Sequence, residues 1–201
     1  MTPSPPCTAY QSRRDPLLFN YESLTSILEN IVQQGYTLLR ADEDPPAEGG
    51  KSFYLRHDVD LSALAAARVG EIEHSLGVVS SFYFLLGADT YNLLDPSTLR
   101  IIEKLRSLGH CVGLHIDERL CSTDGYTVRN TLEWFRECIA EIDPVVSFHR
   151  PTPAVLNRDY AGFMSAYRPA IFSDNHYLSD SRRNDEFYPR LQAWTRSWSV
   201  C

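Results

Sequence analysis

Between residues 52 and 149 the chain alternates short apolar segments typical of strands with longer segments of helical periodicity. The strand-like segments are 52–59, 78–86, 111–116 and 145–149, and the helix-like segments between them are 61–76, 95–108 and 128–142. Strands joined by helices in this way pair in parallel, because each helix carries the chain back to the same end of the sheet. The alternation therefore predicts an α/β fold, and it leaves open whether the sheet is open or closed into a barrel.

The flanking segments complete this prediction. Residues 1–16 are rich in Pro, Ser and Thr and are expected to form a flexible N-terminal arm. Residues 21–34 have helical spacing and end at Gly35, and after the last predicted strand we expect a short helix over 158–167 and a strand over 170–173. Neither an internal repeat nor a linker divides the remainder, so 17–201 is predicted to be a single domain.

Composition narrows the function and the location. A formal net charge of -7, with Lys and Arg scattered, argues against nucleic acid as a partner. The five cysteines are odd in number and lack zinc-knuckle spacing, so we expect reduced thiols, with Cys111 and Cys138 buried. The chain has neither an apolar run of membrane-spanning length nor an N-terminal secretory signal. These features predict a cytoplasmic protein that does not enter the membrane, and they leave the oligomeric state open.

Polar side chains follow three of the predicted strands at the end where each strand stops. In α/β folds the carboxyl ends of parallel strands meet at one edge, which is where ligands bind. The residues at these positions are His57, Asp58 and Asp60 after the first strand, His115 and Asp117 after the third, and His149 and Arg150 after the fourth. The sequence thus predicts a polar site at this edge.

The residue types favour a metal ion or acid/base chemistry at that edge. Alternation along a strand places Asp58 and Asp60 on one face and His57 on the other. Two carboxylates so close repel each other unless a cation or a proton lies between them. Asp and His ligands from separate strands suit a divalent ion that keeps one position open for water, and a carboxylate left free can act as base.

A purely structural explanation competes with this one. Asp also caps helices and opens turns, and a single buried histidine usually satisfies a hydrogen bond, as we expect for His74 and His110. The coincidence of Asp and His at three successive strand ends favours a functional site. The segment 173–183 is either an ordinary loop or a further part of that site, to which it could contribute Asp174, His176, Asp180 or Arg182.

The motifs in this order resemble a known family. The stretch "LRHDVDLSALAAARVGEIEHSLGVVSSFYFLL", followed by "YNLL" and "GHCVGLHID", is similar to the intracellular branch of the polysaccharide deacetylase superfamily, the NodB-homology or carbohydrate esterase 4 type. The resemblance covers roughly residues 17–183, and its most specific parts are "RHDVD", "GHCVGLH" and "SFHRP". It implies a distorted, incomplete (β/α) barrel and metal-dependent hydrolysis of an N- or O-acetyl group on a carbohydrate.

The resemblance also implies roles for individual residues. Asp58 matches the catalytic base, and Val59 stands where the family has a metal-binding aspartate, so Asp60 takes that role. His115 matches the first histidine of a His-x-x-x-His motif whose second position is Arg119, and His149 is the candidate replacement ligand. Arg150 matches the arginine of the family's Arg-x-Pro motif, which orients the base, so the resemblance implies that Arg150 is a catalytic residue. The ion would be zinc, with cobalt or nickel as alternatives.

The largest departure concerns the family's final motif, whose histidine protonates the leaving group. No histidine follows His176. We therefore expect His176, or a bound water, to supply that proton. Otherwise the chain is truncated or altered at its C-terminal end and is a weak or inactive member.

The sequence thus predicts an acetyl hydrolase of carbohydrates, with a metal-bound water as nucleophile and Asp58 as base. Tyr83, Tyr91 and Tyr177 are candidates for stacking on a sugar, although core packing explains Tyr83 equally well. A non-enzymatic carbohydrate-binding or scaffold protein of the same fold is the alternative from a different class. A metal-dependent hydrolase of non-sugar amides would share the site and differ in its loops.

Overall fold

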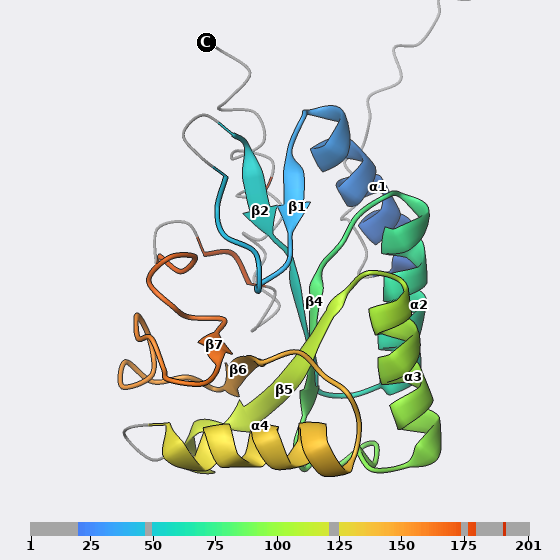
Figure 1. Cartoon of the computed structure of the whole chain (residues 1–201). Helices are drawn as coiled ribbons and strands as arrows, with labels where there is room; N and C mark the ends of the chain where they lie inside the picture. Colours follow the sequence, from blue (N-terminus) through green and yellow to red (C-terminus); the bar gives the residue numbers. More distant parts are fainter. Residues whose placement is uncertain (1–19, 47–49, 121–124, 174–176, 180–190, 192–201) are drawn as a thin grey trace, which may run out of the picture.

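The computed structural model describes residues 20–46, 50–120, 125–173, 177–179 and 191. From β3 to β6 its strands and helices alternate as the sequence predicts (Figure 1). In chain order they are α1 (Tyr21–Gln33), β1 (Thr37–Leu39), β2 (Ser52–Tyr54), β3 (Arg56–Val59), α2 (Ala63–Ser75), β4 (Ser81–Leu85), α3 (Pro96–Ser107), β5 (Cys111–Asp117), a 3-10 helix (Glu118–Leu120), α4 (Tyr126–Cys138), β6 (Val145–His149) and β7 (Met164–Ser165).

The strands form two parallel sheets. The larger has the order β3-β4-β5-β6-β7, in which every strand pairs with its neighbour in sequence, and the smaller contains β1 and β2. Within the described residues the larger sheet does not close into a barrel, and β3 and β7 are its edges. The predicted α/β class with parallel pairing is therefore confirmed.

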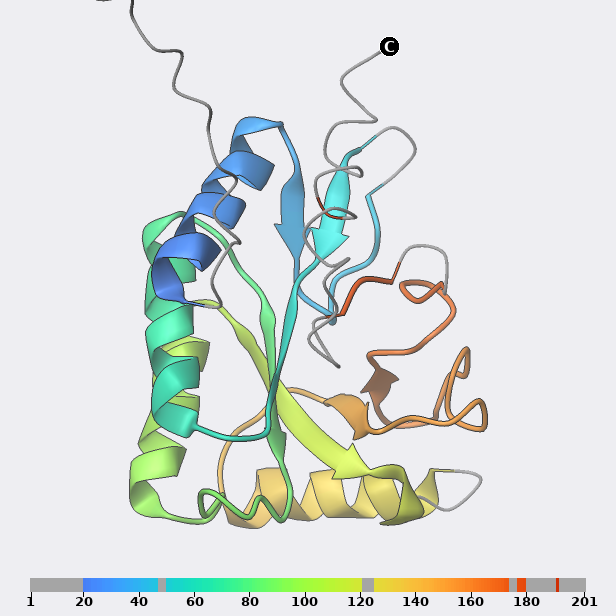
Figure 2. The ribbon, with the colours of Figure 1, turned by 180° about the vertical axis from the view of Figure 1, so that it is seen from behind.

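The two faces of the larger sheet differ, since one packs on most of the large apolar side chains of the core and the other carries most of the candidate site residues. Figures 1 and 2 show α1, α2 and α3 side by side on one side of the sheet, with α4 across its lower end and the segment after β6 on the opposite side. Phe82, Phe84, Leu114 and Phe148 are fully or almost fully buried in the apolar core. The strand register places alternate residues on the other face, among them Arg56, Asp58, Tyr83, His115, Ser147 and His149.

Local signals explain why the helices begin where they do. Asp95 caps α3 by accepting a hydrogen bond from Ser97 N at 2.8 Å, and Pro96 occupies the first helical position. Ser62 caps α2 in the same way, accepting from Ala65 N. This cap lies two residues after Asp60, and α2 begins at the next residue, so the cap fixes the turn that follows β3.

A glycine allows the two central strands to approach closely. A Cβ on Gly113 of β5 would lie 2.1 Å from the carbonyl oxygen of Val145, at the start of β6. Because no real side chain tolerates such a contact, only glycine permits this spacing. Two residues further along β5 is His115, paired in register with Ser147 of β6.

Several sequence predictions about secondary structure are wrong. The predicted strand 52–59 is divided between two sheets, and β1 and β7 lie where the sequence predicts no strand. No helix forms over 158–167, because Asn157 has a left-handed backbone (φ 52°) and the chain reverses so that Tyr160 pairs with Phe163. Residues 170–173 form a turn and loop rather than a strand.

The two cysteines that were expected to be buried differ: Cys111 is buried, but Cys138 is exposed.

Two further expectations concern membrane insertion and the chain ends. No helix in the described ranges is long and apolar enough to cross a membrane. The predicted flexible arm, residues 1–16, lies outside the described residues. The prediction of one domain over 17–201 stays a prediction.

Candidate metal centre

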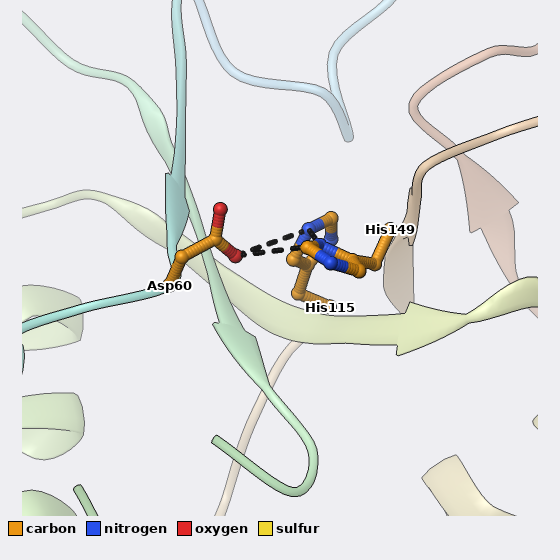
Figure 3. A group of neighbouring side chains, drawn as sticks. All are labelled: Asp60, His115 and His149. Atoms are coloured by element: carbon orange, nitrogen blue, oxygen red, sulfur yellow. Dashed lines mark hydrogen bonds and ion pairs between the residues drawn. The ribbon is translucent and has the colours of Figure 1, made fainter. Parts of the chain in front are cut away.

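Three of the predicted site residues meet at the carboxyl ends of the strands. Figure 3 shows Asp60, His115 and His149 with their side chains directed toward one another. The Asp60 Oδ1 atom lies 3.4 Å from His115 Nε2 and 3.6 Å from His149 Nδ1, and the two ring nitrogens are 3.1 Å apart. These three residues, predicted from the sequence as metal ligands, form a group that could hold a metal ion.

Hydrogen bonding orients the His115 ring for such a role. Its Nδ1 atom lies 3.0 Å from the carbonyl oxygen of Ser147 on the neighbouring strand. A carbonyl only accepts, so Nδ1 carries the proton and Nε2 presents a lone pair to the cluster. Burial of the ring lowers the pKa of His115, although the charges of Asp58 and Asp60 act in the opposite direction. A neutral imidazole with its lone pair facing inward is the form that binds metal.

The spacing of the donor atoms fits a small tetrahedral ion. Bonds of about 2.0–2.2 Å to nitrogen and oxygen place neighbouring ligand atoms about 3.3–3.6 Å apart in a tetrahedron. The three separations in the cluster, from 3.1 to 3.6 Å, are close to that range. Asp60 Oδ1 is buried and accepts no hydrogen bond from any described residue, so a cation would satisfy an otherwise unpaired atom. Two imidazoles and one carboxylate are a typical ligand set for zinc and for late first-row metals.

The loop after β4 fixes the end of β3 in place. The Tyr91 hydroxyl donates to the carbonyl oxygen of Val59 at 2.7 Å and accepts from the backbone N–H of Leu85 at 2.8 Å, which ties the ends of two adjacent strands together. Thr90 Oγ1 donates to the carbonyl oxygen of Asp60. These contacts hold Asp60 beside the histidines of β5 and β6.

Asp58, the predicted base, lies on the same sheet face as the cluster but is not one of its members. Its Oδ2 atom is 3.3 Å from Nη2 of Arg56, which precedes it by two residues on β3. Its Oδ1 atom is buried and has no hydrogen-bond partner among the described residues. One oxygen of this carboxylate is therefore held, and the other is free to accept a proton.

Other predicted residues lie apart from the cluster. Arg150 is exposed, has a left-handed backbone (φ 53°), and forms no hydrogen bond or ion pair with a described residue. The contact with Asp58 that the resemblance implies for Arg150 is made instead by Arg56. The left-handed turn at Arg150 directs the chain away directly after His149. Asp117 and Arg119 form an ion pair with each other, which holds the pKa of Asp117 well below its usual range.

The opposite face of β3 carries a buried polar network. Glu73 of α2 is fully buried, with its Oε1 2.6 Å from His57 Nε2 and its Oε2 accepting from the Ser80 hydroxyl at 2.6 Å. His110 Nδ1 is 3.7 Å from the same carboxylate, and its Nε2 donates to the carbonyl oxygen of Gly70 at 3.0 Å. The network joins α2 to the strand that carries Asp58.

The remaining predicted histidines and tyrosines make contacts within the protein. His110 is buried, and His74 is exposed with its Nδ1 3.0 Å from the Leu108 carbonyl oxygen; both contacts are structural, as expected. Tyr83 is fully buried, so the core-packing alternative holds for it. The hydroxyl groups of Tyr91 and Tyr177 are engaged with protein groups.

The last segment contains several predicted candidates whose positions are not described. His176, the predicted proton donor, lies outside the described residues, as do Asp174, Asp180 and Arg182. Their roles stay predictions.

The sequence predicted no supporting role for three residues that hold the site in place. The contacts that hold the end of β3 are made by Arg56, Glu73 and Tyr91. Only Arg56 had a signal of this role in the sequence, because it shares a strand face with Asp58.

Comparison with known proteins adds no assignment: no family model, no curated protein and no solved structure matches this chain.

Proposed function

We propose that this chain is a metal-dependent hydrolase that removes acetyl groups from a carbohydrate. The observation that carries the proposal is the convergence of Asp60, His115 and His149, with Asp58 beside them on the same face of the sheet. The resemblance of "RHDVD", "GHCVGLH" and "SFHRP" to the polysaccharide deacetylase motifs supports the same activity. The sequential all-parallel strand order is compatible with the incomplete (β/α) barrel of that family.

Each residue has a distinct chemical task in this proposal. Asp60, His115 and His149 would hold a divalent cation, with zinc as the first candidate and cobalt or nickel as alternatives. When bound, such an ion polarises a carbonyl and acidifies water. Asp58 takes the proton from the attacking water through its free Oδ1. His176 is the proposed source of the proton for the departing amine or alcohol.

Metal removal tests the proposal. We expect the purified protein to release acetate from oligosaccharides of N-acetylglucosamine or from O-acetylated oligosaccharides. Dialysis against a chelator should abolish the release, because the charge of the ion stabilises the transition state, and adding zinc, cobalt or nickel should restore it. Acetate would be quantified with an enzyme-coupled assay, and N-acetyl amino acids would serve as non-sugar amides.

The outcomes separate the alternatives. Acetate release that needs the metal and occurs only with sugars supports the proposal. Release only from the amino-acid amides would assign the site to a hydrolase of non-sugar amides. A protein that binds metal and sugar but releases no acetate would be the non-enzymatic member of the fold.

A further inference from the structure

The Arg56 side chain lies between the predicted base and two tyrosines from the segment after β7. Its Nη2 atom donates to the hydroxyl oxygens of Tyr167 at 2.7 Å and Tyr177 at 2.8 Å, and lies 3.3 Å from Asp58 Oδ2. The guanidinium carbon is 4.5 Å from the ring centre of Tyr167 and 5.3 Å from that of Tyr177. Two hydroxyls and two ring faces therefore fix the plane of the guanidinium group.

The tyrosines are themselves fixed, which makes the arrangement rigid. Tyr167 is buried, its ring packs against Phe172, and its backbone N–H donates to Ser165 Oγ at 3.1 Å. Tyr177 also packs against Phe172. Desolvation alone would lower the pKa of Arg56, but Asp58, Tyr167 and Tyr177 outweigh it and raise that pKa further, so the group stays charged.

The contact with Asp58 divides the two carboxylate oxygens between different tasks. Oδ2 faces Arg56, while Oδ1 is buried and without a hydrogen-bond partner in the described part of the chain. A base held by one oxygen cannot rotate freely, so its other oxygen stays aimed at the same point. Asp58 shares the sheet face of His115, and its charge opposes the lowering of the His115 pKa by burial.

We propose that Arg56, clamped by Tyr167 and Tyr177, is the positioning residue for the Asp58 base. The inference rests on the proposed function and adds to it Arg56, the first residue of "RHDVD", to which the resemblance assigns no role. Arg56 touches neither the cluster nor the reacting atoms, so it acts through Asp58. Without the Arg56 contact the Asp58 carboxylate can leave its productive orientation. We therefore expect kcat to fall on the order of 100-fold when this contact is lost.

The test uses the zinc-loaded full chain and 4-nitrophenyl acetate, an activated ester that needs no sugar subsite. For Arg56→Ala we expect kcat to fall on the order of 100-fold while KM and metal content stay unchanged. Added guanidinium ion at a non-denaturing concentration should restore part of kcat. Tyr167→Phe removes one hydroxyl and leaves the ring, so a smaller loss is expected.

Arg56→Lys covers the case in which the alanine variant does not fold. Lys keeps the charge but cannot hold the carboxylate and both tyrosines in one planar arrangement, so kcat should still fall about tenfold. Folded Arg56 variants with wild-type kcat, lowered only in thermal stability, would overturn the inference. Asp58→Asn distinguishes failure of the proposed function from failure of the inference about Arg56. If this variant hydrolyses the ester as fast as wild type, the proposed base and the role of Arg56 both fail. If it is impaired while the Arg56 variants are not, only the inference about Arg56 fails.

Discussion

Replacing Glu73 with Gln is expected to lower the free energy of unfolding by about 3 kcal/mol, the size of effect seen when one partner of a buried ion pair is removed. Glu73 is fully buried and holds His57, Ser80 and His110 around its two oxygens. The amide cannot accept at both positions, so either the buried Ser80 hydroxyl or the half-buried His57 ring loses its acceptor. Chemical denaturation followed by circular dichroism measures the change.

Glu71 supplies a matched control on the same helix. It is two residues away and forms exposed ion pairs with Arg68 and Lys104. Because solvent screens such pairs, Glu71→Gln should change the unfolding midpoint little. Equal destabilisation by the two substitutions would contradict the assigned role of Glu73.

The same network sets the pH dependence of stability. Burial alone would raise the pKa of Glu73, but His57, Ser80 and His110 outweigh it and lower that pKa below its ordinary value of 4.5. Desolvation lowers the pKa of His110 below 6.5. In both cases the unfolded chain takes up a proton at a higher pH than the folded chain does. Wild-type stability should therefore fall as the pH is lowered below about 6.5 and fall further below about 4.5. The second part should be smaller in Glu73→Gln but not absent, because the pKa of Asp117 is also lowered in the folded chain.

Asp58→Asn should reduce hydrolysis of an acetylated substrate by about 10²- to 10⁴-fold, the usual contribution of a general base. The amide keeps the shape of the side chain but cannot take a proton from water. Because Asp58 is not part of the cluster formed by Asp60, His115 and His149, metal content should be unchanged. Steady-state kinetics and elemental analysis on the same preparation separate the two effects.

Asp89→Asn is the control for this substitution, since Asp89 is an exposed carboxylate in the loop that follows β4. It should retain wild-type activity. An Asp58→Asn variant with full activity would exclude Asp58 as the base, and loss of metal from it would make Asp58 a ligand instead.

The central part of the fold could be predicted because its signals are local. Asp95 and Pro96 define the start of α3, and β6 spans the 145–149 segment read from its apolar run. The three-residue β1 and the two-residue β7 carry no such signal, since they exist only through pairing with β2 and β6. Apolar spacing alone suggested a helix over 158–167, where left-handed residues and a ring contact between Tyr160 and Phe163 reverse the chain.

The candidate site divides in the same way. Parallel strands align their carboxyl ends, so the positions of Asp60, His115 and His149 at the ends of predicted strands placed them at one edge of the sheet. Their supporting partners depend on contacts distant in sequence: Arg56 reaches Tyr167 and Tyr177, and His57 reaches Glu73. The family motif suggested Arg150 for the contact with Asp58, but the left-handed turn after His149 turns that residue outward, where it is exposed.

The most direct test of the account is the metal content of the purified protein, measured by elemental analysis after reconstitution with zinc, cobalt or nickel. We expect near-stoichiometric metal in the wild type and its loss in Asp60→Ala, His115→Ala and His149→Ala, because each supplies one donor atom to the cluster. His74→Ala, a control at an exposed histidine outside the cluster, should bind metal as the wild type does. A wild-type protein that binds none of the three metals, or cluster variants that bind as well as wild type, would contradict the account.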